Sequence, residues 1–515
     1  MSPVLILISI TVYFLLLLLI AKITSRNADN ESYFIGNRKS SWILVSFGLI
    51  ADSLSGVTYI SVPGAVGTYQ FSYMQLVLGY LFGYLVISYI LLPIYYRMQL
   101  TSIYVYLRER FGVVSQRTGS FFFLLSRLFG SAARLYLAVI VMQTFLFDQM
   151  GVPFWLSVSI IIGLILAYTY KGGIKTLVYT DTFQSGLLLL GLILTIVFII
   201  QAMDLSMINS VKMIYQSTYS HMFFWDWKDN NFFLKQFLGG MFIAIAMTGL
   251  DQNMMQKNLS CPRLKDAQKN MNTFGVVVII INLLFVSLGA LLYLYSNYAG
   301  ISTPARTDEL FPMLAFGHLG LWAGLVFIIG LSAATFSSAD SVLTTLTTSF
   351  YIDFLKKEGD DEAMLDTKKR YLIHFMFAVL LLLIILGIKA LNKQAVIDLV
   401  FLLAGYTYGP LLGLFFVGIF TKIQVKEKWI PLVAVLSPLI GHSLKTILYQ
   451  PALQKALENG GLNWYDNGMY QIGQWISAAT GLALDYKIGN ELILITGIIM
   501  TLGMFIIFRK ETNNE

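Results

Sequence analysis

The chain has 515 residues, of which 57% are hydrophobic and only 12% are charged, a composition typical of multi-pass membrane proteins and unlike that of a water-soluble domain. Its net charge of +7 does not indicate nucleic-acid binding, because the basic residues lie in short stretches between apolar segments. The single cysteine, Cys261, excludes an intramolecular disulfide.

Thirteen segments are long and apolar enough to cross a bilayer as helices, which takes about 20 residues each. They are 3–22, 41–68, 74–96, 119–147, 153–170, 178–202, 234–255, 273–297, 320–350, 371–390, 395–420, 429–449 and 490–508. The first lacks the basic start and cleavage site of a signal peptide, so we expect it to persist as a helix. The sequence therefore predicts an all-α, polytopic membrane protein without a separate soluble domain.

The basic residues also predict an orientation. With the N-terminus outside, 24 of the 35 lysines and arginines fall on the cytoplasmic side and 9 on the outer side, while Arg127 and Arg134 lie inside a helix. Cytoplasmic loops of membrane proteins carry such an excess. We expect the N-terminus outside and the C-terminus in the cytoplasm.

Segment 41–68 contains the stretch LIADSLSGVTYISVPGAVG, which combines Asp52 and several hydroxyls with Gly56 and Pro63. Polar groups inside a bilayer are costly unless they face a cavity, so they are candidates for function. Glycine and proline make local unwinding of such a helix tolerable. The stretch therefore predicts a broken helix that exposes backbone carbonyls.

A second polar cluster, in segment 320–350, lies at a similar depth. Ala51 is about 15 Å from the inner end of its helix and Ala334 about 21 Å from the outer end of its own. Hydroxyls such as Ser337 and Ser338, together with freed carbonyls, suit a hard cation such as Na⁺. The alternative is that the hydroxyls bond to their own helix and only assist packing.

Arg134 lies near the middle of segment 119–147, about 22 Å from Gly119. A guanidinium at that depth can hold a solute carboxylate with two parallel hydrogen bonds. The alternative is an internal ion pair with a buried acid such as Asp52.

Enzymatic motifs are absent from the sequence. It contains no Walker A loop, HExxH, GxSxG or paired CxxC, and its four histidines are scattered. We therefore expect neither an enzyme nor a metal site other than one for Na⁺.

Three motifs in the expected order resemble the sodium:solute symporter family. They are LTSIYVYLRERFG (100–112), YKGGIKTLVYTDTFQSGLLLLG (170–191) and AGYTYGPLLGLFFVGIFTK (404–422). The resemblance spans roughly residues 30–425 and implies the leucine-transporter fold. In that fold a core, here 41–425, contains two inverted five-helix repeats, 41–202 and 234–425, whose first helices are broken. Residues 1–40 would add one helix before the core, and 426–515 two helices after it.

The family pattern also implies ion sites. Its core sodium site corresponds here to Ala51, Leu54, Ala334, Ser337 and Ser338. A second cation site, present in some members, corresponds to Asp181, Ser337, Asp340 and Ser341. Asp340 departs from the pattern, which has a hydroxyl there; its carboxylate could strengthen the cation site, bind a proton or pair with Arg127. The resemblance thus implies coupling to one sodium ion, or to two.

For the solute, the pattern of the sugar transporters is missing, because their polar positions are occupied by Val278, Phe401 and Ala244. The sialic acid transporters are closer, although two of their positions are here Tyr73 and Val77. The predicted substrate-binding residues are Ser53, Ser55, Thr58, Tyr73 and Arg134.

The sequence therefore predicts a symporter of the cell's inner (plasma) membrane that imports a small organic solute with Na⁺ by alternating access. A carboxylate such as a sialic acid is the favoured solute. A neutral solute (an amino acid, polyol or sugar), with Arg134 structural, is the alternative. A non-transporting membrane sensor on the same scaffold is a further alternative, disfavoured because no output domain follows the helices. The solute, the ion stoichiometry, the oligomeric state and the roles of Asp52 and Asp340 stay open.

Overall fold

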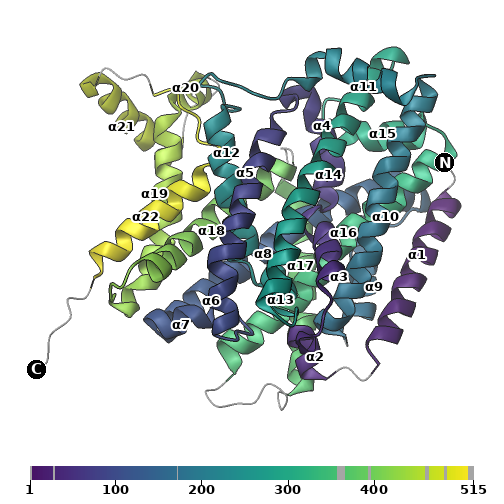
Figure 1. Ribbon diagram of the computed structural model, residues 1–515. Helices are drawn as coiled ribbons and strands as arrows, with labels where there is room; N and C mark the ends of the chain where they lie inside the picture. The colour runs from purple at the N-terminus through teal and green to yellow at the C-terminus, as the bar shows by residue number, and fades with distance from the viewer. Residues whose placement is uncertain are drawn as a thin grey trace, which may run out of the picture.

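The computed structural model describes residues 3–26, 29–170, 172–356, 366–391, 396–458, 463–480 and 484–508. Within these ranges the chain is helical apart from turns, loops and three isolated β-bridges, which confirms the all-α prediction (Figure 1). Nine of the described helices are long and apolar enough to cross a membrane, or eleven spans if each of two bent pairs is counted as one. Two further helices, α9 (Phe154–Thr169) and α22 (Leu492–Ile506), are apolar but shorter, and the total of thirteen spans stays a prediction.

The helices of the first half are α1 (Pro3–Thr24), α2 (Asn30–Ile35), α3 (Trp42–Ser53), α4 (Gly56–Tyr69), α5 (Tyr73–Val86), α6 (Leu92–Arg97), α7 (Val105–Phe111), α8 (Val113–Met142), α9 (Phe154–Thr169), α10 (Gly173–Ala202) and α11 (Met207–Gln216). Those of the second half are α12 (Phe233–Ala244), α13 (Gln252–Leu259), α14 (Leu264–Tyr298), α15 (Leu310–Gly317), α16 (Leu321–Phe350), α17 (Thr367–Leu391), α18 (Val396–Phe420), α19 (Ile430–Leu448), α20 (Gln450–Glu458), α21 (Trp464–Thr480) and α22 (Leu492–Ile506).

Three long helices begin several residues before the apolar segments that predicted them. Helix α8 begins at Val113, α10 at Gly173 and α14 at Leu264. Their first turns carry polar and charged residues, and hydropathy measures the length of the apolar stretch rather than that of the helix. The extra turns therefore extend these helices beyond the apolar layer.

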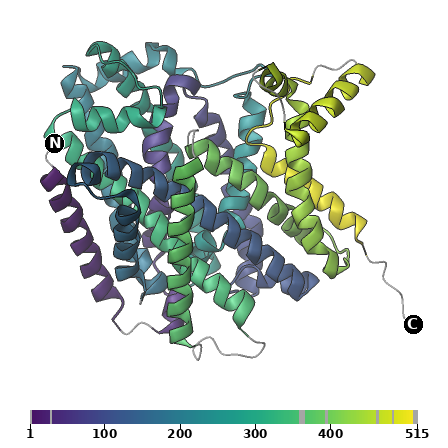
Figure 2. The same ribbon diagram turned by 180° about the vertical axis from the view of Figure 1, so that it is seen from behind.

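Short helices also occupy stretches for which the sequence predicted no structure. Helices α11, α15 and α20 lie at the end of the molecule where the N-terminus is found, and α2 and α7 lie at the opposite end (Figure 1). Both views place α1 at one edge and the C-terminal helices α19, α21 and α22 at the other (Figure 2). Helix α22 packs along α18 and α19, so the last helices extend the core rather than form a separate unit.

Two spans are broken where the sequence and the family pattern placed the breaks. Helices α3 and α4 meet at 57° around Leu54, and α12, with the π-helical turn that follows it (Ile245–Gly249), meets α13 at 62°. A Cβ on Gly56 would lie 2.2 Å from Thr335 Oγ1, so only glycine permits the approach of α4 to α16. The second break ends at Asp251, whose carboxylate accepts a hydrogen bond from Met254 N at 3.1 Å and caps α13.

Candidate functional site

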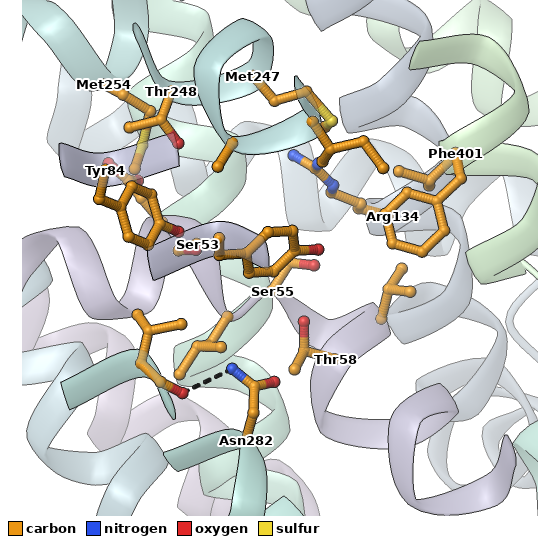
Figure 3. A pocket seen from close by; sticks show the side chains of 18 of the residues that line it. Ser53, Ser55, Thr58, Tyr84, Arg134, Met247, Thr248, Met254, Asn282 and Phe401 are labelled. Atoms are coloured by element: carbon orange, nitrogen blue, oxygen red, sulfur yellow. Dashed lines mark hydrogen bonds between the residues drawn. The ribbon is translucent and has the colours of Figure 1, made fainter. Parts of the chain in front are cut away.

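A cavity with about 740 Å³ of space between atoms, part of it open to solvent, lies beside the break between α3 and α4. All five predicted substrate-binding residues line it: Ser53, Ser55, Thr58, Tyr73 and Arg134. Figure 3 shows Arg134 and Phe401 on one side of the cavity and Tyr84 and Thr248 on the other, with the three hydroxyls of the broken helix between them. The break therefore turns a membrane helix into a cavity wall.

The positions that argued against a sugar also lie in this wall. Val278, Phe401 and Ala244 line the cavity and offer no hydrogen-bonding side chain, whereas Val77 is buried elsewhere. Sequence reasoning missed several polar members, among them Tyr84, Thr248 and Asn282. The amide of Asn282 donates to the carbonyl of Val278 at 2.8 Å (Figure 3). An asparagine in the middle of the apolar segment 273–297 is the signal that could have revealed it.

Three charged side chains line the cavity, and two of them have partners. Arg127 Nε forms an ion pair with Asp251 Oδ2 at 2.5 Å, and Tyr408 donates to the same carboxylate. Asp52 forms an ion pair with Lys257. Among the described residues, no ion pair or hydrogen bond reaches the guanidinium of Arg134, which is partly exposed.

These contacts correct two pairings considered from the sequence. Asp52 does not pair with Arg134 and Asp340 does not pair with Arg127, because Lys257 of α13 pairs with Asp52 and Asp251, the cap of α13, pairs with Arg127. Lys257 follows the predicted segment 234–255 directly and is one of the basic residues that the charge count places on the cytoplasmic side, whereas its side chain is only 1% exposed. The tertiary packing of α13 against α3 and α16 buries it.

The residues predicted for the core sodium site lie at the break and on the facing part of α16. Among the described residues, no hydrogen bond reaches the carbonyl oxygens of Ala51 or Leu54, as expected for the end of an unwound helix. Ser338 Oγ donates to the carbonyl of Thr335 at 2.9 Å, and lies 3.5 Å from that of Ala334. These carbonyls and hydroxyls are the ligand types that a hard cation prefers.

The second predicted cation site contains an amino group. Asp181 accepts from Ser337 Oγ at 3.1 Å and from Lys257 Nζ at 2.5 Å, and Ser341 accepts from Lys257 Nζ at 2.8 Å. Asp340 instead accepts from Tyr168 at 2.8 Å. The structure therefore brings together three of the four predicted residues and adds Lys257, which was not predicted.

The profile of the sodium:solute symporter family matches residues 33–427, which is most of the chain. The chain belongs to the sodium:solute symporter family. Like its family, the protein is a multi-pass membrane protein that couples solute import to Na⁺.

Named relatives and a solved structure agree with this assignment. The sodium/sialic acid symporter SiaT of Proteus mirabilis is 24% identical over 445 residues, which cover 83% of this chain and 87% of that protein. Sodium-coupled monocarboxylate transporter 1 of Mus musculus is 25% identical over 407 residues, covering 76% of this chain and 64% of that protein. A structure of a Na⁺-coupled sialic acid symporter in a substrate-bound outward-open state superposes with a TM-score of 0.75 at 21% identity, covering 97% of both chains. The fold is thus that of a sodium-coupled symporter.

Proposed function

We propose that this symporter imports a small organic carboxylate, and that Arg134 binds the carboxylate of the solute. One observation carries the proposal: of the three charged side chains in the cavity wall, Arg134 is the one without an ion-pair partner among the described residues. A guanidinium inside a membrane protein is costly unless it is paired or solvated. A bound carboxylate supplies the missing charge through two parallel hydrogen bonds.

The rest of the wall suits a solute with one anionic group and a modest number of hydroxyls. Ser55 and Thr58 line the same cavity as Arg134 and can donate or accept hydrogen bonds, while Met247 and Phe401 offer apolar surface (Figure 3). A sialic acid has this chemistry, and so do smaller organic acids. Two relatives are named for a sialic acid and for monocarboxylates, which supports the same class.

Na⁺ binding at Ala51, Leu54, Ala334, Ser337 and Ser338 belongs to the same proposal. An ion there joins α3 to α16 and fixes the break that forms the cavity wall, so each ligand raises the affinity of the other. The family match supports a transport core at 41–425, with inverted repeats 41–202 and 234–425 that rock between outward-open and inward-open states.

The membrane assignment is also part of the proposal. The protein lies in the plasma membrane with its N-terminus outside; the C-terminal residues 509–515, placed in the cytoplasm by the charge bias, lie outside the described residues. It acts as a transporter and not as an enzyme.

The test is sodium-dependent uptake of a labelled panel of carboxylates, amino acids, polyols and sugars into proteoliposomes. Arg134→Gln removes the charge while keeping an amide of similar reach. We expect it to abolish uptake of the transported carboxylate and to leave the amount of folded protein unchanged. Arg134→Lys, which keeps the charge but loses the bidentate geometry, should retain part of the uptake.

Arg370→Gln is the matched control, because Arg370 is 5% exposed, donates to Asn30 Oδ1 at 2.8 Å and lies over the ring of Tyr33, far from the cavity wall. It should leave solute selectivity unchanged. Uptake of a neutral solute that survives Arg134→Gln would refute the carboxylate proposal and favour a structural arginine.

A further inference from the structure

Lys257 occupies the centre of a buried cluster beneath the cavity. Its ammonium donates to Asp52, to Asp181 Oδ2 at 2.5 Å and to Ser341 Oγ at 2.8 Å. A lysine ammonium has three N–H donors, so all of them are used. The side chains of Asp52 and Asp181 are 0% exposed, so water does not compete for these bonds.

The ammonium uses the oxygens that a second sodium ion would need. Asp181 and Ser341 are two of the four residues predicted for that ion, and both already bind Lys257 Nζ. The remaining oxygen of Asp181 accepts from Ser337. A sodium ion needs several oxygen ligands and is repelled by a neighbouring positive charge. The second cation site therefore does not fit Na⁺ while Lys257 is in place.

We propose that Lys257 is a built-in cation that replaces the second sodium ion, so that this symporter binds and couples a single Na⁺. The inference rests on the sodium-coupled transport of the family and deepens its ion coupling. It concerns the ion alone and does not depend on which solute is carried.

The charges around the cluster agree with one mobile cation. If both Asp52 and Asp181 are ionised, Lys257 balances one of their two charges, and one further cation would balance the other. The core sodium site is adjacent, because its Ser337 hydroxyl donates to Asp181. A hydroxyl that donates its proton keeps lone pairs for Na⁺, so Ser337 can donate to Asp181 and bind Na⁺ at the same time.

One more acid lies on the same helix. Asp340 is 0% exposed; one of its oxygens accepts from Tyr168, and the other has no hydrogen-bond partner among the described residues. No direct contact joins its carboxylate to Lys257. It is the group that would hold a second sodium ion if the proposal were wrong.

A lysine ammonium, unlike a free sodium ion, is covalently attached to the chain and links helices permanently. Lys257 belongs to α13, whereas its three partners belong to α3, α10 and α16. Lys257 thus links α13, the second half of one broken span, to α3, the first half of the other, and to the two unbroken helices α10 and α16. A second Na⁺ would leave on each cycle, but Lys257 cannot.

The test counts sodium ions on the purified full-length protein, with Na⁺ as the only ligand. Equilibrium dialysis with radioactive sodium should give one ion per wild-type chain and none for Ser338→Ala. Lys257→Gln, which removes the charge and adds an amide oxygen, should bind two ions. Adding Asp181→Asn to Lys257→Gln should remove the second ion.

Two variants control for lost folding. Lys257→Gln/Asp52→Asn removes one carboxylate together with the ammonium and should also bind two ions. Lys235→Gln is the matched control, because Lys235 is a buried lysine paired with Glu491 at 3.4 Å away from both sites; it should bind one ion.

Two sodium ions on the wild-type chain would overturn the proposal, and loss of one on Asp340→Asn would then locate the extra ion. The proposal would also fail if a folded Lys257→Gln protein bound one ion. If neither Lys257 variant folds, the wild-type count alone decides. Failure of the carboxylate proposal would instead appear in solute uptake, with the sodium count unchanged.

Discussion

Gly56→Ala should damage the junction between the broken span and α16. The added Cβ would lie 2.2 Å from Thr335 Oγ1, 3.4 Å from Thr335 Cβ and 3.5 Å from Leu331 Cδ1. The last two distances are ordinary contacts, so the conflict is with one hydroxyl. Thr335 is fully buried in α16, and its branched side chain can move the hydroxyl only by driving its methyl group into packed surroundings.

Overpacking of this kind costs typically about 1–3 kcal/mol, and we expect a value near 2 kcal/mol because a single atom must be displaced. The strain pushes α4 away from α16 directly beside the break, where Leu54 and α16 carry residues proposed to bind Na⁺. If about 1.4 kcal/mol of this strain energy weakens Na⁺ binding at the proposed site, the affinity for Na⁺ decreases tenfold. Both the melting temperature without Na⁺ and the stabilisation by Na⁺ should therefore decrease.

The assay is thermal unfolding of the purified protein over a sodium titration. Gly130→Ala is the matched control, since nothing lies within 4 Å of a Cβ built there, and alanine in a helix interior gains about 0.5–1 kcal/mol over glycine. Thr335→Ala removes the clashing hydroxyl, which has no hydrogen-bond partner among the described residues, so the double variant should recover most of the loss. Wild-type stability and sodium affinity in Gly56→Ala, or no recovery in the double variant, would refute this account.

Two further predictions concern the ion pair and the sodium site. Arg127→Gln leaves the carboxylate of Asp251 buried without its charged partner, which should cost about 3–5 kcal/mol, whereas Arg127→Gln/Asp251→Asn should recover a large part of that loss in thermal unfolding. Ser338→Ala should abolish stabilisation by Na⁺, while Ser349→Ala, which removes a buried hydroxyl of the same helix that has no partner among the described residues, should retain it; equal responses of the two would contradict the core-site assignment.

Local sequence was enough to predict the elements that depend on local chemistry. Apolar length predicts a membrane span, and glycine and proline among hydroxyls predict a break, so the bend between α3 and α4 was expected. The cavity position of Arg134 followed from its depth alone, because an arginine near the midplane must face protein or water.

The partners of the buried charges could not be predicted in this way. Asp251 lies near the end of the predicted segment 234–255 and Lys257 lies just beyond it, in a stretch too polar to be predicted as part of a membrane span, yet all eight residues of α13 are buried. Four helices distant in sequence enclose that stretch, and no local pattern encodes their approach. The available signal was indirect: Asp52 and Asp181 in apolar segments required a cation.

Asp52 belongs both to the solute cavity and to the buried cluster around Lys257. It lines the solute cavity and also accepts from Lys257, so it is shared between the cavity wall and the ion cluster. Asp251 has the corresponding place at the second break, where it caps α13 and holds Arg127 in the same wall. Because Asp251 caps α13 and Lys257 belongs to it, a displacement of this helix changes the cavity and the cluster together. A solute in this cavity therefore lies beside both Asp52 and Arg127, whose partners are Lys257 in α13 and Asp251 at its cap.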